Sequence, residues 1–121
     1  MNQLGKNYAE SQSYETFMRL ACQCNAGEFG ANKNKMELLM DYEDGLYKTT
    51  PSEARKLLSD VQNHMIDAIK FAIKRKDIAK PDKDHLKSYL PWIKSAGSSN
   101  GLLDICKGAI LLLAKYKPSE S

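Results

Sequence analysis

A four-residue motif marks the start of the longest helix that this sequence predicts. Thr50 is a good helix N-cap, Pro51 suits the first helical position, and Glu53 completes a capping box. Apolar residues then recur at three- and four-residue steps for about seven turns, to around Arg75. The members of this stripe are Ala54, Leu57, Leu58, Val61, Met65, Ala68, Ile69, Ala72 and Ile73. The pattern predicts a long amphipathic helix with one buried face.

Composition favours helix in the rest of the chain as well. Leu occurs 14 times and Ala 11 times, whereas Val occurs once and Thr three times. Leu and Ala lose little freedom in a helix, whereas β-branched residues suit strands. Four further helices are predicted: Tyr8–Cys24, Lys35–Asp44, one capped by Asp82 or Asp84 and ended by Gly97, and Leu102–Tyr116. The 121 residues are therefore expected to form one all-α domain, a compact bundle of about five helices with a frayed tail at 118–121.

The boundaries of the first two helices follow from local signals. Asn7 is the expected N-cap of the first helix, because Glu10 stands three residues later. The segment 27–34 holds two glycines and two asparagines and is expected to be a loop. Gly45 should end the second helix through a left-handed cap.

Two prolines and one apolar run shape the expectations for the last two helices. Pro81 disfavours helical geometry at Lys80 and predicts a break there. Pro91 predicts a kink or a restart, since it removes a backbone donor. Apolar residues at 110–113 run nearly all round the last helix, which predicts that this helix lies at the centre of the bundle.

Several functional classes are excluded by composition. The longest apolar run, 109–114, is six residues, far short of the roughly 20 that a membrane span needs. The first six residues lack the apolar region of a secretory signal. Three cysteines at no disulfide-framework spacing indicate a reducing compartment. We therefore expect a cytoplasmic protein with no membrane partner.

No motif predicts catalysis, a metal or a cofactor. Cys22 and Cys24 would point about 200° apart on a helix, so they cannot face one ion and are expected to be small core residues. No cysteine has a sequence signal of a lowered thiol pKa nearby, so neither His64 nor His85 is expected to act as the base of a cysteine nucleophile. Three acids lack the glycine and the bidentate glutamate of a calcium loop and are expected to cap helices and balance charge: Asp77, Asp82 and Asp84. We therefore expect a protein that is not an enzyme.

Charge is distributed unevenly. Residues 1–50 carry five basic and seven acidic residues, whereas 51–121 carry thirteen and eight. Lysines neutralise phosphates without reading sequence, so the dense basic stretch predicts RNA-backbone binding, the alternative being a solvated helix face. The predicted nucleic-acid-binding residues are Lys70, Lys74, Arg75, Lys76, Lys80, Lys83 and Lys87, with Trp92 and Tyr89 as candidate stacking residues. For Tyr89 the alternative is core packing.

Three short motifs resemble the small all-helical subunits of type III CRISPR effector complexes. Asn100-Gly101-Leu102, with the apolar run that ends at 113–115, is similar to a helix of one branch of that group. Thr49-Thr50 followed by Arg55 resembles a motif of the other branch, as does the closing segment 103–116. The resemblance implies a non-catalytic scaffold subunit of an antiviral ribonucleoprotein. Such subunits stack as copies and steady the guide–target duplex through basic residues.

The acidic pole supports an alternative from another class. Glu37, Asp41, Glu43 and Asp44 have no basic residue among them. Small helical inhibitors and immunity-type proteins bind one protein partner through such a charged helix face. On this hypothesis the four acids form the active surface, and RNA binding is absent.

Overall fold

Five α-helices make up the computed structural model, which describes residues 3–22, 30–46 and 48–116. They are α1 (Gln3–Cys22), α2 (Gly30–Glu43), α3 (Pro51–Ile73), α4 (Lys80–Ser95) and α5 (Ser99–Leu113), and a 3₁₀ turn, η2 (Ala114–Tyr116), extends α5. The described residues contain no strand, and the predicted all-α bundle of about five helices is confirmed.

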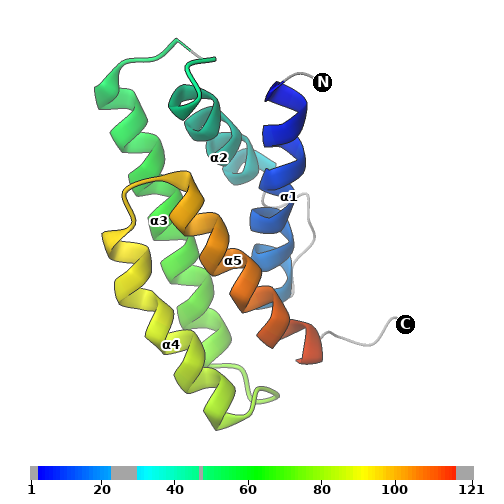
Figure 1. Cartoon of the computed structure of the whole chain (residues 1–121). Helices are drawn as coiled ribbons and strands as arrows, with labels where there is room; N and C mark the ends of the chain where they lie inside the picture. The colour runs from blue at the N-terminus through cyan, green and yellow to red at the C-terminus, as the bar shows by residue number, and fades with distance from the viewer. Residues whose placement is uncertain (1–2, 23–29, 47, 117–121) are drawn as a thin grey trace.

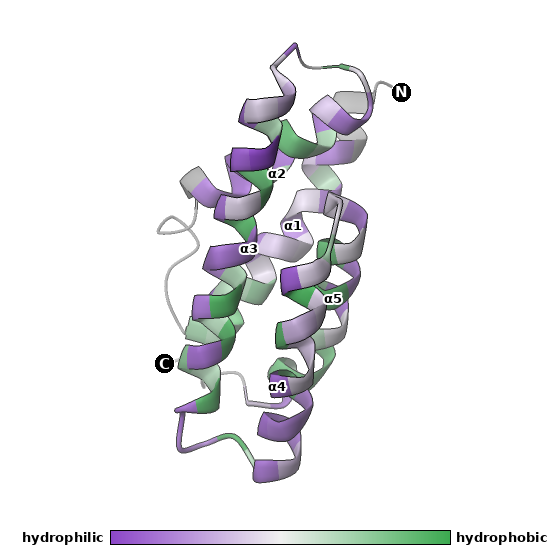
Figure 2. Cartoon of the chain, turned by 90° about the vertical axis from the view of Figure 1, so that its left-hand side faces the viewer, coloured by the Kyte–Doolittle hydropathy of each residue, from purple (hydrophilic) through white to green (hydrophobic). Residues whose placement is uncertain are grey.

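The helices pack around one apolar core. α1 contacts α2, α3 and α5, while α3 also contacts α2 and α4, and α4 packs beside α5 (Figure 1). α3 and α4 run antiparallel and are joined by residues 74–79 at one end of the bundle (Figure 1). The core holds large side chains that are fully buried, among them Tyr14, Phe17, Met65 and Leu102. Seen from the side of α3 and α4, hydrophilic residues cover the outer surface of α4 (Figure 2).

The capping box that opens α3 forms as predicted. The Thr50 hydroxyl oxygen accepts a hydrogen bond from the Glu53 N–H at 3.1 Å, and the Glu53 carboxylate accepts one from the Thr50 N–H at 3.3 Å. Gly45 adopts φ 75°, the left-handed conformation expected after α2. Both predictions are confirmed. The sequence could predict them because each feature depends only on residues that are close neighbours in the chain.

Replacing Thr50 with alanine should lower the free energy of unfolding by about 1 kcal/mol, because the first turn of α3 loses its side-chain acceptor. Thr50→Ser keeps that oxygen and should stay within a few tenths of a kcal/mol of the wild type. Urea unfolding followed by circular dichroism measures both variants. Equal stability of Thr50→Ala and wild type would contradict this role.

The predicted boundaries of the first two helices are wrong in part. α1 begins at Gln3, and Asn7 lies inside it as a buried side chain rather than at its N-cap. The Asn7 amide donates hydrogen bonds to the carboxylates of Asp41 at 2.6 Å and Asp44 at 3.0 Å. Residues 30–34, predicted as loop, form the first turns of α2, while Cys24 and 27–29 lie outside the described residues. The partners of Asn7 lie on α2 and in the turn that follows it, which is why local spacing misplaced Asn7.

The start and course of α4 also differ from the prediction. Its N-cap is Ala79, and Pro81 lies in its first turn, so neither Asp82 nor Asp84 caps it. The helix continues through Pro91 without the predicted restart. Pro91 is exposed, so water can satisfy the carbonyl that loses its backbone donor.

α5 is not the central helix of the bundle. It starts at Ser99, earlier than predicted, and buries only one side, which includes Leu102, Cys106 and Leu113. Leu111 on the opposite side is 77% exposed. The run of apolar residues at 110–113 therefore covers both the buried and the outward sides of the helix.

Candidate nucleic-acid interface

Three lysines form a row along α4. Lys80, Lys87 and Lys94 follow one another at seven-residue steps, so they share one side of the helix with an axial spacing of about 10 Å. Lys87 stands two residues before Tyr89, about 160–200° round the axis from it. The Tyr89 hydroxyl faces α5, within 2.7 Å of where a Cβ on Gly108 would stand. The row therefore lies on the side of α4 that faces away from α5.

The last turn of α3 brings further lysines beside this row. Lys70 stands nine residues after the core residue Val61, about 180° round α3, and so points away from the core. Lys74 follows one turn later. The Gln62 side chain ties the two helices together by donating hydrogen bonds at 3.0 Å to the carbonyls of Ile93 and Ala96.

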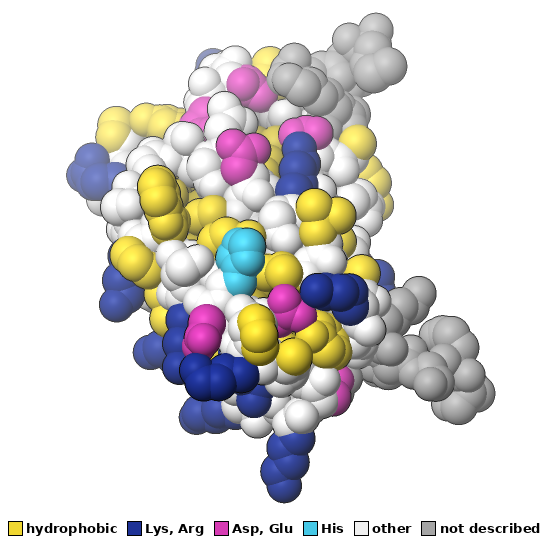
Figure 3. Space-filling model, turned by 60° about the horizontal axis from the view of Figure 1, so that its bottom comes forward, with side chains coloured by type: hydrophobic (Ala, Val, Ile, Leu, Met, Phe, Trp, Pro, Cys, Tyr) yellow, Lys and Arg dark blue, Asp and Glu magenta, His cyan; other side chains and the backbone are white. Residues whose placement is uncertain are grey.

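We define the lysine face as the lysines from the last turn of α3, from the 74–79 connection and from α4; they are Lys70, Lys74, Lys76, Lys80, Lys83, Lys87 and Lys94. Dark-blue side chains gather along one side of the end of the molecule that comes forward in Figure 3, whereas the magenta side chains are more scattered. Six of the seven residues were predicted from the sequence. Lys94 was left out of the predicted site, although its seven-residue spacing from Lys87 was readable once α4 was known to pass through Pro91.

Most of the charge on the lysine face is uncompensated. Lys80 forms an exposed ion pair with Asp84 at 3.1 Å, which is a weak interaction at a solvated surface. Lys83 is half-buried, and its charge adds a small part to the lowering of the Asp77 pKa, which is due mainly to the hydrogen bonds from Arg75. The other members are exposed and make no ion pair with any described residue: Lys70, Lys74, Lys76, Lys87 and Lys94.

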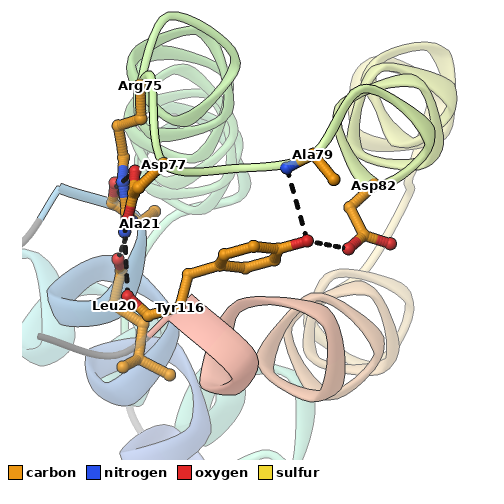
Figure 4. Close-up of polar contacts among 7 residues, drawn as sticks. All are labelled: Leu20, Ala21, Arg75, Asp77, Ala79, Asp82 and Tyr116. Atoms are coloured by element: carbon orange, nitrogen blue, oxygen red, sulfur yellow. Dashed lines mark hydrogen bonds and ion pairs between the residues drawn. The ribbon is translucent and has the colours of Figure 1, made fainter.

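The prediction that Arg75 binds nucleic acid is wrong. Its side chain is buried, and Nη1 donates to the carbonyls of Leu20 at 2.7 Å and Ala21 at 3.3 Å at the end of α1 (Figure 4). Nε and Nη2 bind both carboxylate oxygens of Asp77, at 3.0 and 2.7 Å, and Nη2 also donates to the carbonyl of Tyr116 at 3.2 Å. Arg75 therefore caps α1 and joins three segments of the chain, because its planar fork satisfies several acceptors at once.

A second link joins the start of α4 to the end of α5. The Tyr116 hydroxyl donates to the Asp82 carboxylate and accepts from the Ala79 N–H at 3.3 Å (Figure 4). The same carboxylate pairs with Lys115 at 3.1 Å. The hydrogen bond from Tyr116, followed by that from Lys115, lowers the pKa of Asp82. Asp82 therefore points towards the end of α5, and its carboxylate forms its ion pair with Lys115 rather than with a lysine of the lysine face.

Asp77 should make the stability of the protein sensitive to acid. The hydrogen bonds from Arg75 lower the pKa of its carboxyl below the usual value of about 3.9. The folded-state pKa lies below the unfolded one, so this stabilisation is present above pH 4 and is lost as the pH falls. Asp77→Asn should be less stable than wild type at pH 7, and the difference in urea midpoint should narrow towards pH 2. A constant difference across that range would contradict the pairing.

The two aromatic residues predicted beside the basic stretch differ in exposure. Tyr89 is half-buried against Gly108, and desolvation raises its pKa, which agrees with the core-packing alternative. Trp92 is 67% exposed. It stands five residues after Lys87, about 140° round α4, so it lies at the edge of the lysine face rather than within it.

Three of the four acids proposed as a protein-binding face make hydrogen bonds inside the fold. Asp41 and Asp44 accept from Asn7. The Glu43 carboxylate accepts from the Ser99 N–H at 3.0 Å and from its hydroxyl at 2.5 Å, and so binds the first turn of α5. Glu43 and Asp44 also line a polar cavity of about 320 Å³. These carboxylates link α1, α2 and α5, but their donors are neutral groups and Glu43 and Asp44 are exposed, so their negative charge still faces solvent.

The remaining chemical candidates are part of the core or lie apart. Cys106 is fully buried and its pKa is raised by desolvation, so its thiol is protonated and shielded. Among the described residues, no three His, Cys, Asp or Glu side chains gather in a way that could hold a metal ion. Within that same part of the chain, every helix is too short or too polar to cross a membrane. No family model, curated protein or solved structure matches the chain.

Proposed function

We propose that this protein is a non-catalytic RNA-associated scaffold subunit that contacts the nucleic-acid backbone through the lysine face. The observation that carries the proposal is a set of exposed ammonium groups, unpaired within the described residues, that extends from the end of α3 and the 74–79 connection along the outer side of α4. A cluster of this kind releases condensed counterions from phosphates, which is the main source of sequence-independent affinity.

The chemistry of the lysine face favours backbone contact over base readout. Arginine is the residue that most often reads bases, because its planar fork matches guanine bidentately. The only arginine of the α3–α4 connection is Arg75, which is buried and fully engaged inside the fold. Lysines act as point charges on flexible stems, so we expect little discrimination between RNA sequences.

The proposed setting is a CRISPR-type ribonucleoprotein, in which other subunits or copies of this chain are the partners. The resemblance of 49–58 and 100–116 to small type III subunits motivates this setting. The small all-helical fold is compatible with it. The Cys106 thiol is buried and so is unsuited to nucleophilic attack.

Fluorescence anisotropy with labelled 20-nucleotide RNA tests the proposal. At about 50 mM salt we expect a micromolar dissociation constant, and log K should fall linearly with log salt with a slope of about −3 to −5, since four to six phosphates are neutralised. Scrambled RNA sequences of equal length should bind within a factor of about two. Absence of binding at 50 mM salt would overturn the proposal and favour the protein-binding alternative.

A further inference from the structure

Two large aromatic side chains are exposed at the borders of the lysine face. Phe71 on α3 is 50% exposed and Trp92 on α4 is 67% exposed. Single exposed apolar residues are ordinary on protein surfaces, so their exposure alone carries no conclusion. Their positions relative to the lysines show whether they belong to the same surface. These positions follow from the helix register and from the contacts that neighbouring residues make.

Phe71 lies on the border of the lysine face that is nearer to α2. It stands eleven residues, about three full turns, after Asp60, so the two share one side of α3. Asp60 pairs with Lys35 of α2 at 3.1 Å, which assigns that side to α2. Phe71 also stands three residues before Lys74, which makes the two neighbours on the helix surface.

Trp92 lies on the opposite border. It stands three residues after Tyr89, whose hydroxyl reaches Gly108, so Trp92 is on the side of α4 that is nearer to α5. The lysines of α3 and α4 lie between these two sides. The surface therefore runs from Phe71, across Lys70 and the Lys80–Lys94 row, to Trp92.

We infer that the lysine face takes single-stranded nucleic acid, with the backbone on the lysines and unpaired bases stacked on Phe71 and Trp92. This inference rests on the proposed function and adds the class of ligand. A duplex hides the faces of its bases within its own stack, so exposed rings offer it nothing beyond the lysines. A single strand presents the same phosphates together with free base faces, and lysine grooves bordered by aromatic rings suit that combination.

Trp92 is the single tryptophan of the chain, so intrinsic fluorescence reports on this one position. The protein is titrated with a 12-nucleotide single-stranded RNA and with the matching 12-base-pair duplex at about 50 mM salt. We expect the single strand to quench Trp92 as a base stacks on its ring. The duplex should bind with at most slight quenching.

Variants then separate stacking from charge. Phe71→Ala and Trp92→Ala should each weaken single-strand binding about 5- to 100-fold by anisotropy, while duplex affinity changes less than about twofold. Trp92→Phe and Phe71→Tyr keep a ring and should retain most of the affinity. Leu111→Ala is the matched control, because Leu111 is 77% exposed on α5 and should leave both affinities unchanged. Circular dichroism verifies that each variant is folded.

The outcomes distinguish the inference from the function on which it rests. Equal effects of the two alanine variants on single strand and duplex, or no effect on either, would overturn the inference while backbone binding stands. Quenching by the duplex as strong as by the single strand would also overturn it. Failure of both RNAs to bind would overturn the proposed function itself.

Discussion

Arg75→Ala is expected to lower the free energy of unfolding by about 2–4 kcal/mol. The substitution leaves the carbonyls of Leu20, Ala21 and Tyr116 without the donor that now satisfies them, and it leaves Asp77 without its bidentate partner. The cost comes mainly from the Leu20 and Ala21 carbonyls, which are left buried without a donor, and from the lost packing of the guanidinium, whereas Asp77 is 47% exposed and can bind water instead. Urea unfolding at pH 7 measures the change.

Two further variants calibrate this result. Arg75→Lys keeps the charge but cannot form the fork, so it should recover only part of the stability. Lys76→Ala removes the neighbouring exposed cation and should stay within about 0.5 kcal/mol of wild type. A loss below about 1 kcal/mol in Arg75→Ala would show that the network does not hold the end of the bundle together.

The burial of Arg75 changes how RNA-binding variants should be designed. A charge reversal that includes Arg75 would unfold the end of the bundle where α1, η2 and the 74–79 connection meet. Weaker RNA binding in such a variant would report unfolding rather than the removal of a phosphate-binding group. Variants for binding must therefore be confined to the exposed lysines.

The second large effect, a loss of RNA affinity, is expected from the triple variant that combines Lys70→Glu, Lys74→Glu and Lys87→Glu. These side chains are exposed and unpaired within the described residues, so their reversal should leave the helical signal and the urea midpoint near those of wild type. RNA affinity at about 100 mM salt should fall about a hundredfold or more. The magnitude of the salt slope should fall by about two to three, since each reversed lysine leaves about one phosphate without its cation.

A second triple variant is the matched control. It changes the net charge of the protein by the same amount, from +3 to −3, but at the other end of α3. Lys48, Arg55 and Lys56 are exposed there, and Lys56 stands eighteen residues before Lys74, about 27 Å along the helix. Their combined reversal to glutamate should weaken RNA binding only slightly through the general field. Equal losses in the two triple variants would mean that net charge, and not the lysine face, governs binding.

Local signals predicted the fold well where the interacting groups are neighbours in sequence. The Thr50–Glu53 capping box and the left-handed Gly45 depend on partners within three or four residues, and both were readable. Asn7 and Arg75 were misread because the partners that draw them into the fold, Asp41 for Asn7 and the carbonyls of Leu20 and Ala21 for Arg75, lie more than 30 residues away. Its residue type and its spacing from Glu10 made Asn7 resemble a helix N-cap. Its position among lysines made Arg75 resemble one more exposed cation of the basic stretch.

The sequence predicted which stretch of the chain forms the candidate interface, but not how its side chains are arranged on α3 and α4. The density of lysines at 70–87 indicated a phosphate-binding surface before any geometry was known. The expectation that Pro91 would kink or restart α4 obscured the Lys80–Lys87–Lys94 register. Phe71 was overlooked because its exposure depends on which sides of α3 are covered by α2 and α4, and neither its type nor its spacing reveals that.

The most direct test of the account is an NMR titration of the ¹⁵N-labelled protein with single-stranded RNA, for which 13.6 kDa is a convenient size. We expect chemical-shift changes concentrated on the outer sides of α3 and α4, from about residue 66 to 94, with the region of Glu37–Asp44 unchanged. Changes centred on Glu37–Asp44, or spread evenly over the bundle, would contradict the assignment of the lysine face as the nucleic-acid interface.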